Sequence, residues 1–191
     1  LDTTPGNAEK FKADRGLDEQ GNHIDYGGKG SYMTVYVPTL EPGHWGEEIA
    51  KWVDLILKDF GADGIFWDEF TRSRGAFVYN KWDGCTADVD PKTFEIQRLK
   101  GSVTLISMPF REAMVKRILS EGRPFVINGA PFARSIYRHK FMAFTETGSI
   151  TNCRKMLLYS PVALGDHITE RVQEDSYRVM LEALDHGCLY S

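Results

Sequence analysis

The sequence predicts an α/β protein: a (β/α)8 barrel, incomplete in this chain, with about six of its strands present. Short apolar runs typical of strands alternate with helical stretches along the 191 residues, and such alternation indicates a parallel sheet covered by helices. Polar or acidic residues directly follow several of these runs, at the edge where barrel enzymes hold their active sites. A Rossmann fold would carry a GxGxxG motif after a strand, and the sequence has none.

Six short runs rich in β-branched, aromatic and other apolar residues are the predicted strands. In chain order they are 33–37, 64–68, 125–128, 141–145, 161–164 and 187–190. The first run is closed by Pro38, which has no N–H to donate to a strand ladder. Because strands and helices alternate, we expect the first five runs to lie parallel in one sheet.

Two long helices are predicted between these strands. The segment 45–60 has apolar residues at helical spacing, and Gly61 follows it as a stop signal. Asp90 and Pro91 suit the N-cap and first position of a helix. We therefore expect a helix from there to about residue 120, bent near Pro109.

The remaining segments are predicted to be loops or shorter helices. Segments 1–31 and 71–92 are rich in turn-forming residues and are expected to be long loops. A short helix is expected near 151–159 and a longer one over 168–185.

Six strands do not close an eight-stranded barrel, which typically takes about 250 residues. The chain opens on residues 1–4 as though a strand had just ended, and it closes on 189–191 as though one had just finished. We therefore expect residues 1–191 to be a single domain, the C-terminal three-quarters of a catalytic barrel. On this hypothesis the first two strands lie upstream, and the remainder of the same polypeptide completes the barrel.

Composition excludes several classes of function. The net charge is −4 and no Lys/Arg run occurs, so we expect no nucleic-acid partner. No apolar stretch approaches the roughly 20 residues needed to span a bilayer, so no membrane partner is expected. HExxH, GxSxG and P-loop motifs are absent, and the three cysteines are widely spaced. We expect neither a metal nor a cofactor, and the cellular compartment stays open.

Two carboxylates at strand ends are the candidate catalytic residues. Asp68 ends the apolar run before it, and Glu146 ends the run at 141–145. Two strand–helix steps between them would place them two strands apart on one rim of a barrel. Two carboxylates that face each other across a barrel mouth are typical of glycoside hydrolases. One attacks the sugar carbon or activates water, and the other donates a proton to the leaving oxygen.

Several other residues are weaker candidates for a role in the site. Strand alternation puts Phe66 and Asp68 on one face, so that the catalytic alternative Glu69 points elsewhere. The residues that are candidates for substrate binding are Asp2, Trp67, Trp82, Asn128 and His167. For the tryptophans, packing in the core is the alternative interpretation. Asp83, Asp88 and Asp90 are expected to serve turns and caps.

The segment from Gly61 to Phe70, GADGIFWDEF, resembles the fourth-strand signature of alpha-glycosidases with (β/α)8 barrels, as in glycoside hydrolase families 31 and 36. This resemblance implies that Asp68 is the nucleophile. In those families the acid/base lies two strands further on, which is the place of Glu146. They usually have Asp there, whereas families 101 and 129 have Glu. The tail from 160 to 190 is also similar to the last part of such barrels.

The sequence therefore predicts a glycoside hydrolase that cleaves O-glycosidic bonds of an oligo- or polysaccharide with retention of configuration. One alternative is a non-catalytic carbohydrate-binding barrel segment, which would not need two facing acids. Another is a lyase or isomerase acting on sugar acids, which would need a Lys or His base in the barrel mouth. The separation between the Asp68 and Glu146 carboxylates would discriminate among these.

Overall fold

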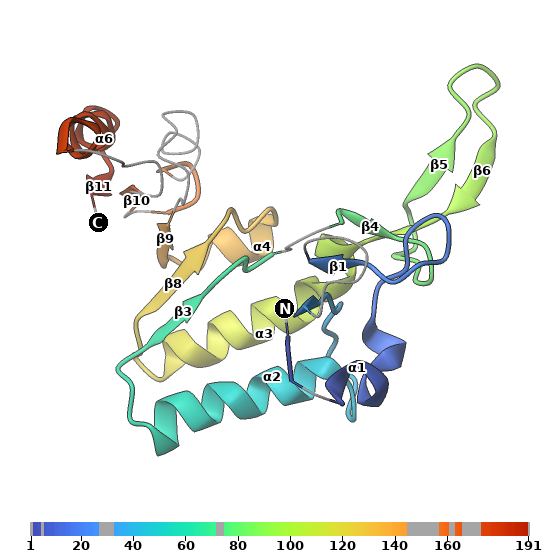
Figure 1. The fold of residues 1–191 in the computed structure, drawn as a ribbon, viewed down its shortest axis with the longest axis horizontal. Coiled ribbons are helices and arrows are strands. Elements are labelled where there is room, and N and C mark those ends of the chain that lie inside the picture. The colour runs from blue at the N-terminus through green and yellow to red at the C-terminus, as the bar shows by residue number, and fades with distance from the viewer. Residues whose placement is uncertain are drawn as a thin grey trace. The chain divides into compact units, whose positions relative to one another are not determined.

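The structure is a computed structural model that describes residues 2–4, 6–26, 33–71, 75–144, 157–160, 163–165 and 173–190. The chain divides into two compact units. The first comprises Leu1–Asp54 and Arg72–Arg111, and the second comprises Leu55–Thr71 and Glu112–Ser191. The second unit holds the parallel sheet (Figure 1).

The second unit is built on a five-stranded sheet. Its strands are β3 (Ile65–Trp67), β8 (Phe125–Asn128), β9 (Met142–Phe144), β10 (Ala163–Gly165) and β11 (Leu189–Tyr190). They lie in the order β11-β10-β9-β8-β3, and each neighbouring pair is parallel. This confirms the prediction that the runs at 64–68, 125–128, 141–145 and 161–164 lie parallel in one sheet.

The two faces of this sheet differ in burial. Ile127 and Ala143 are fully buried and share one face with Trp67, their partner in register. Phe66 is 56% exposed and lies on the opposite face. The covered face therefore forms the core of the unit, whose buried residues also include Val115 of a neighbouring helix segment.

In the first unit, the run 33–37 does not join the parallel sheet. Its β2 (Met33–Thr34) pairs antiparallel with β1 (Asp25–Tyr26), and Tyr36 makes an antiparallel bridge to Arg15. The prediction of a parallel strand at 33–37 is therefore wrong. The run is buried as expected of a core strand. Burial does not specify which strand it pairs with, and the polar segment before it in the sequence provides an antiparallel partner.

A long helix follows this run, as its apolar periodicity predicts. It comprises α2 (Trp45–Asp54), continued by the π-helical turn η2 (Leu55–Asp59), and Gly61 follows with a positive φ of 67°. The N–H of Trp45 donates to the buried carboxylate of Asp14 at 2.8 Å. This carboxylate comes from the short η1 (Lys12–Asp14), after α1 (Asn7–Lys10), and caps the helix from a distant segment.

The predicted helix from Asp90 begins later than expected, at α3 (Val103–Ser120). The residues before it form the antiparallel hairpin of β5 (Ala87–Val89) and β6 (Ile96–Leu99), followed by β7 (Gly101–Ser102), which pairs with β4 (Phe77–Val78). The Asp90 carboxylate accepts the N–H groups of Lys92 and Thr93. The capping chemistry is present, but it closes a hairpin turn instead of starting a helix.

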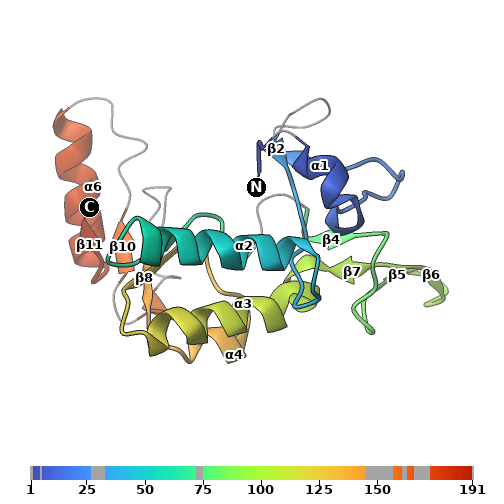
Figure 2. The ribbon, with the colours of Figure 1, turned by 90° about the horizontal axis from the view of Figure 1, so that it is seen from below.

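The N-terminal parts of α2 and α3 lie side by side (Figures 1 and 2). Pro109 lies inside α3, as predicted. Within the described part of the chain, the remaining helices are α4 (Arg134–Tyr137) and α6 (Gln173–Asp185). The latter confirms the C-terminal part of the helix predicted over 168–185. Most of the helix predicted near 151–159 lies outside the described residues. Among the described helices, none is long and apolar enough to cross a membrane.

Candidate functional site

The carboxyl ends of β3 and β8 bring two predicted site residues together. The strands are neighbours in parallel register, with Trp67 opposite Ile127, so their carboxyl ends are level. Asp68 follows β3, and Asn128 is the last residue of β8. The Asn128 Nδ2 donates to the Asp68 Oδ1 at 2.8 Å. Because Asn128 is buried and Asp68 is exposed, the amide anchors a carboxylate that opens to solvent.

The backbone turns sharply just after Asp68. Glu69 has a φ of +45°, a conformation that costs a residue other than glycine about 1–3 kcal/mol and is concentrated at functional sites. The next residue, Phe70, is fully buried, and its N–H donates to the Asn128 carbonyl at 3.1 Å. The Thr71 hydroxyl donates to the Ala130 carbonyl at 2.6 Å. These two hydrogen bonds fix the chain on the carboxyl side of Asp68, and the pairing of β3 with β8 fixes it on the amino side.

An aromatic pair, which we call the aromatic platform, lies on the same sheet face as Asp68. It comprises Phe66 and Phe144, whose ring centroids are 5.9 Å apart with an interplanar angle of 67°. Phe66 is two residues before Asp68, and Phe144 is the register partner of Asn128. Strand alternation predicts that Phe66 shares the face of Asp68, whereas the position of Phe144 beside Phe66 depends on the register of β9 against β8.

Trp67 lies on the other face of the sheet and belongs to the core of the unit. Its ring contacts Phe70 edge-to-face, with centroids 5.3 Å apart, and Phe125 with centroids 6.4 Å apart. The structure therefore does not bring Trp67 together with Asp68, and the core interpretation describes it. The alternative catalytic residue Glu69 has its Oε2 buried, unlike the exposed Asp68.

Two other candidates belong to the first unit. The Asp2 carboxylate is buried and accepts the N–H of Thr4 at 3.0 Å. Trp82 is 55% exposed, and its Nε1 donates to the Thr86 carbonyl at 3.2 Å. Asp2 therefore has a local role in its own segment, and Trp82 presents part of its ring to solvent.

Two candidates, Glu146 and His167, lie outside the described residues. The strand order nevertheless bears on Glu146, because β9, the strand before it in sequence, is separated from β3 by β8 alone. Among the described residues, no group of three or more His, Cys, Asp or Glu side chains could hold a metal ion.

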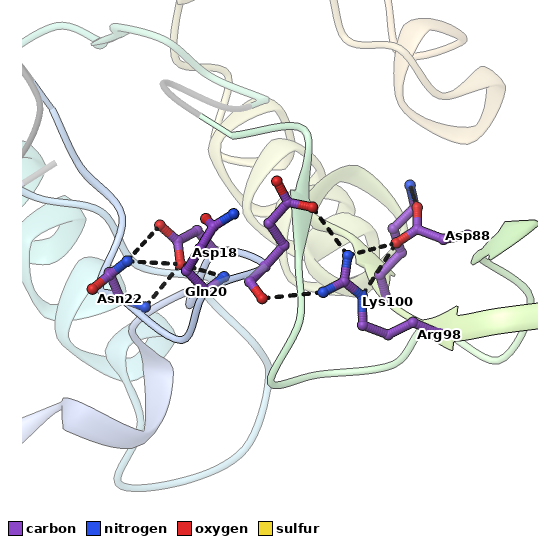
Figure 3. A network of polar contacts seen from close by, with 7 residues as sticks. Asp18, Gln20, Asn22, Asp88, Arg98 and Lys100 are labelled. Carbon is purple, nitrogen blue, oxygen red and sulfur yellow. Dashed lines mark hydrogen bonds and ion pairs between the residues drawn. The ribbon is translucent and has the colours of Figure 1, made fainter.

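The first unit contains a separate polar network at the base of the β5–β6 hairpin (Figure 3). The Arg98 guanidinium lies 3.0 Å from Glu19 and 3.1 Å from Asp88, and it stacks 4.1 Å above the ring of Tyr79. The Lys100 ammonium donates to Asp88 and holds the pKa of that carboxyl below its usual range. An open pocket of about 480 Å³ lies here.

The charges that line this pocket are already paired with one another. Arg98 and Lys100 share Asp88, and Arg98 also donates to the Glu19 backbone carbonyl at 3.1 Å. Such a network fixes the hairpin to the segment around residue 19. We therefore place the candidate site at Asp68, although the pocket itself lies in the other unit.

Comparisons with known proteins add no family assignment. No family model, no curated protein and no solved structure matches the chain. The function is therefore argued from the arrangement of Asp68, Asn128 and the aromatic platform.

Proposed function

We propose that the protein is a glycoside hydrolase that cleaves O-glycosidic bonds of an oligo- or polysaccharide, with Asp68 as its nucleophile. The observation that carries this proposal is the hydrogen bond of 2.8 Å between Asn128 and an exposed carboxylate at the carboxyl edge of a parallel sheet. In parallel α/β proteins this edge is where substrates bind. We propose further that the five-stranded sheet is part of a (β/α)8 barrel.

In this mechanism Asn128 holds one carboxylate oxygen of Asp68 so that the other faces the sugar. That oxygen forms a bond to the anomeric carbon while the glycosidic C–O bond breaks. The proton needed by the departing oxygen comes from a second carboxyl group, for which the sequence offers Glu146. Water then releases the sugar, and its proton returns to the second carboxylate.

Trapping of the covalent intermediate tests this proposal. A panel of 2-deoxy-2-fluoro glycosyl fluorides is incubated with the full-length protein, because the fluorine slows the release of a glycosyl-enzyme while fluoride remains a good leaving group. We expect one sugar adduct by intact mass, mapped to the peptide containing Asp68. Asp68→Asn should abolish the adduct.

A matched control is available just before the same strand. Asp63 is an exposed carboxylate that precedes β3, whereas Asp68 follows it. Asp63→Asn should be labelled like the wild type. An adduct on any other residue would show that Asp68 is not the nucleophile. If no sugar of the panel forms an adduct or is turned over, the glycosidase proposal is overturned.

A further inference from the structure

We propose that the aromatic platform, Phe66 with Phe144, is the surface on which the apolar face of a pyranose ring lies during cleavage at Asp68. This inference rests on the proposed function and adds residues that determine which sugar is accepted. It assigns a binding role to two phenylalanines, whereas the tryptophan of the same strand is packed in the core.

The geometry places the platform within the span of one sugar ring from Asp68 and Asn128. Phe66 and Asp68 are two residues apart on one edge of the sheet, and Asn128 and Phe144 are register partners on the two strands beside it. The ring contact between Phe66 and Phe144 at 5.9 Å spans β8. Two aromatic rings, a carboxylate and an amide therefore occupy one patch of a single sheet face.

The sheet face that carries Phe66 is accessible to a ligand. Phe66 is 56% exposed in the middle of a strand, and leaving a large apolar side chain in water forgoes about 1.5–3 kcal/mol of burial. The apolar surface continues through Val126 and Met142, which are only half-buried. A contiguous apolar surface next to fixed polar groups is typical of a binding site.

The mixture of groups fits a sugar better than a flat apolar molecule. A pyranose ring has C–H groups on a face and hydroxyl groups around its rim, so it can contact an aromatic ring and hydrogen-bond at the same time. The Asp68 carboxylate can accept hydrogen bonds from hydroxyl groups, and the Asn128 side chain lies beside it. Because the two rings meet at 67°, one can lie under the sugar while the other borders it.

Kinetic variants of the full-length protein test the platform. With the glycoside that the wild type cleaves fastest in a panel of aryl α- and β-pyranosides, Phe66→Ala should raise KM about tenfold, the size of one lost aromatic contact. Phe66→Leu keeps an apolar side chain without the ring and should raise KM almost as much. Phe60→Ala is the control, because Phe60 is 74% exposed in the same unit and precedes β3.

A binding measurement separates this inference from the proposed function. Saturation-transfer NMR with methyl α- and β-pyranosides reads sugar binding in the Asp68→Asn protein, where no turnover is needed. Binding that is lost in Phe66→Ala and in Phe144→Ala, but kept in Phe60→Ala, supports the platform even if no glycoside is hydrolysed. Unchanged KM and unchanged binding in Phe66→Ala, with only a lower melting temperature, would make Phe66 a core residue and overturn the platform while leaving the glycosidase proposal intact.

Discussion

At the scale of single residues, the buried amide of Asn128 does what a second carboxylate in its place could not. It donates to Asp68 without adding a like charge. An exposed carboxylate otherwise samples several rotamers, so the hydrogen bond selects one orientation before a substrate arrives. Such preorganisation is the general way in which a neighbouring side chain contributes to a reaction rate.

Removal of this amide tests its role. Asn128→Ala should lower kcat about 10- to 100-fold, because Asp68 loses its fixed orientation, whereas KM should change little. Steady-state kinetics on the best aryl glycoside measures both constants. A change in KM alone would show that Asn128 binds the substrate instead of orienting Asp68.

A second residue-scale prediction concerns acid stability. Hydrogen bonding by Lys116 and then by Arg138, against the opposing effect of burial, lowers the pKa of Glu112 from 4.5 to about 2. A depressed pKa stabilises the fold above the unfolded value and loses that contribution as the pH falls through the folded value. The stabilisation should therefore disappear between about pH 4.5 and pH 2.

Thermal melts across that pH range measure this effect. Glu112→Gln should be less stable than the wild type at pH 7 by about 1 kcal/mol, a value kept small because solvent screens part of the interaction. The gap should close as the pH approaches 2. Glu174→Gln, at an exposed position of α6, is the control. A gap that persists at low pH would mean that the ion pairs of Glu112 are not its cause.

At the scale of elements, Asp83 ties a loop to a strand. Its carboxylate accepts the Thr86 hydroxyl at 2.5 Å and the Ser102 N–H at 2.7 Å, and it also accepts the N–H groups of Cys85 and Thr86. Burial alone would raise its pKa, but these hydrogen bonds together hold it well below the usual range. The sequence-based interpretation of this residue as turn chemistry is confirmed.

Loss of the Asp83 carboxylate should destabilise the first unit. Asp83→Ala removes several hydrogen bonds to a charged acceptor and leaves partly buried N–H groups behind, a cost of about 2–3 kcal/mol. Urea unfolding followed by circular dichroism gives this value. Asp63→Ala, at an exposed carboxylate, should change it by less than about 0.5 kcal/mol. Equal effects of the two substitutions would refute the stabilising role of the Asp83 hydrogen bonds.

The start of β3 offers a test that connects packing to the site. A side chain at Gly64 would clash with the Pro124 carbonyl oxygen, which accepts the Ile65 N–H at 3.0 Å. Gly64→Ala should force β3 away from β8, destabilise the unit by about 1–3 kcal/mol and lower kcat by disturbing the Asp68–Asn128 contact. Full activity with normal stability in this variant would contradict the tight strand pairing.

At the scale of the whole molecule, the order of strands bears on the predicted pair of carboxylates. β3 and β9 stand on either side of β8, so the carboxylates that follow them belong to strands two places apart. A separation of about 5–5.5 Å would favour retention, whereas about 6.5–9.5 Å would leave room for an attacking water. NMR of the first sugar released from a defined glycoside should show the retained anomer. First release of the inverted anomer would exclude a covalent role for Asp68.

The whole fold was only partly predictable from local patterns. The helix at 45–59 and four parallel strands follow from the spacing of apolar residues, because that spacing reflects which side chains of a single segment are buried. The run 33–37 and the segment after Asp90 were assigned wrongly. A buried apolar run is compatible with parallel or antiparallel partners, and an Asp–Pro step is compatible with a helix start or a hairpin turn.

The sequence by itself determined that Asp68 ends a buried strand, that Asn128 ends another, and that Phe66 shares a face with Asp68. These are properties of short segments with a period of two. Only the tertiary structure decided that Asn128 meets Asp68 across 60 residues of chain, and that Phe144 meets Phe66 while Trp67 enters the core. The reason is strand register: a one-residue shift would send each of these side chains to the opposite face, and no local pattern fixes the register between distant strands.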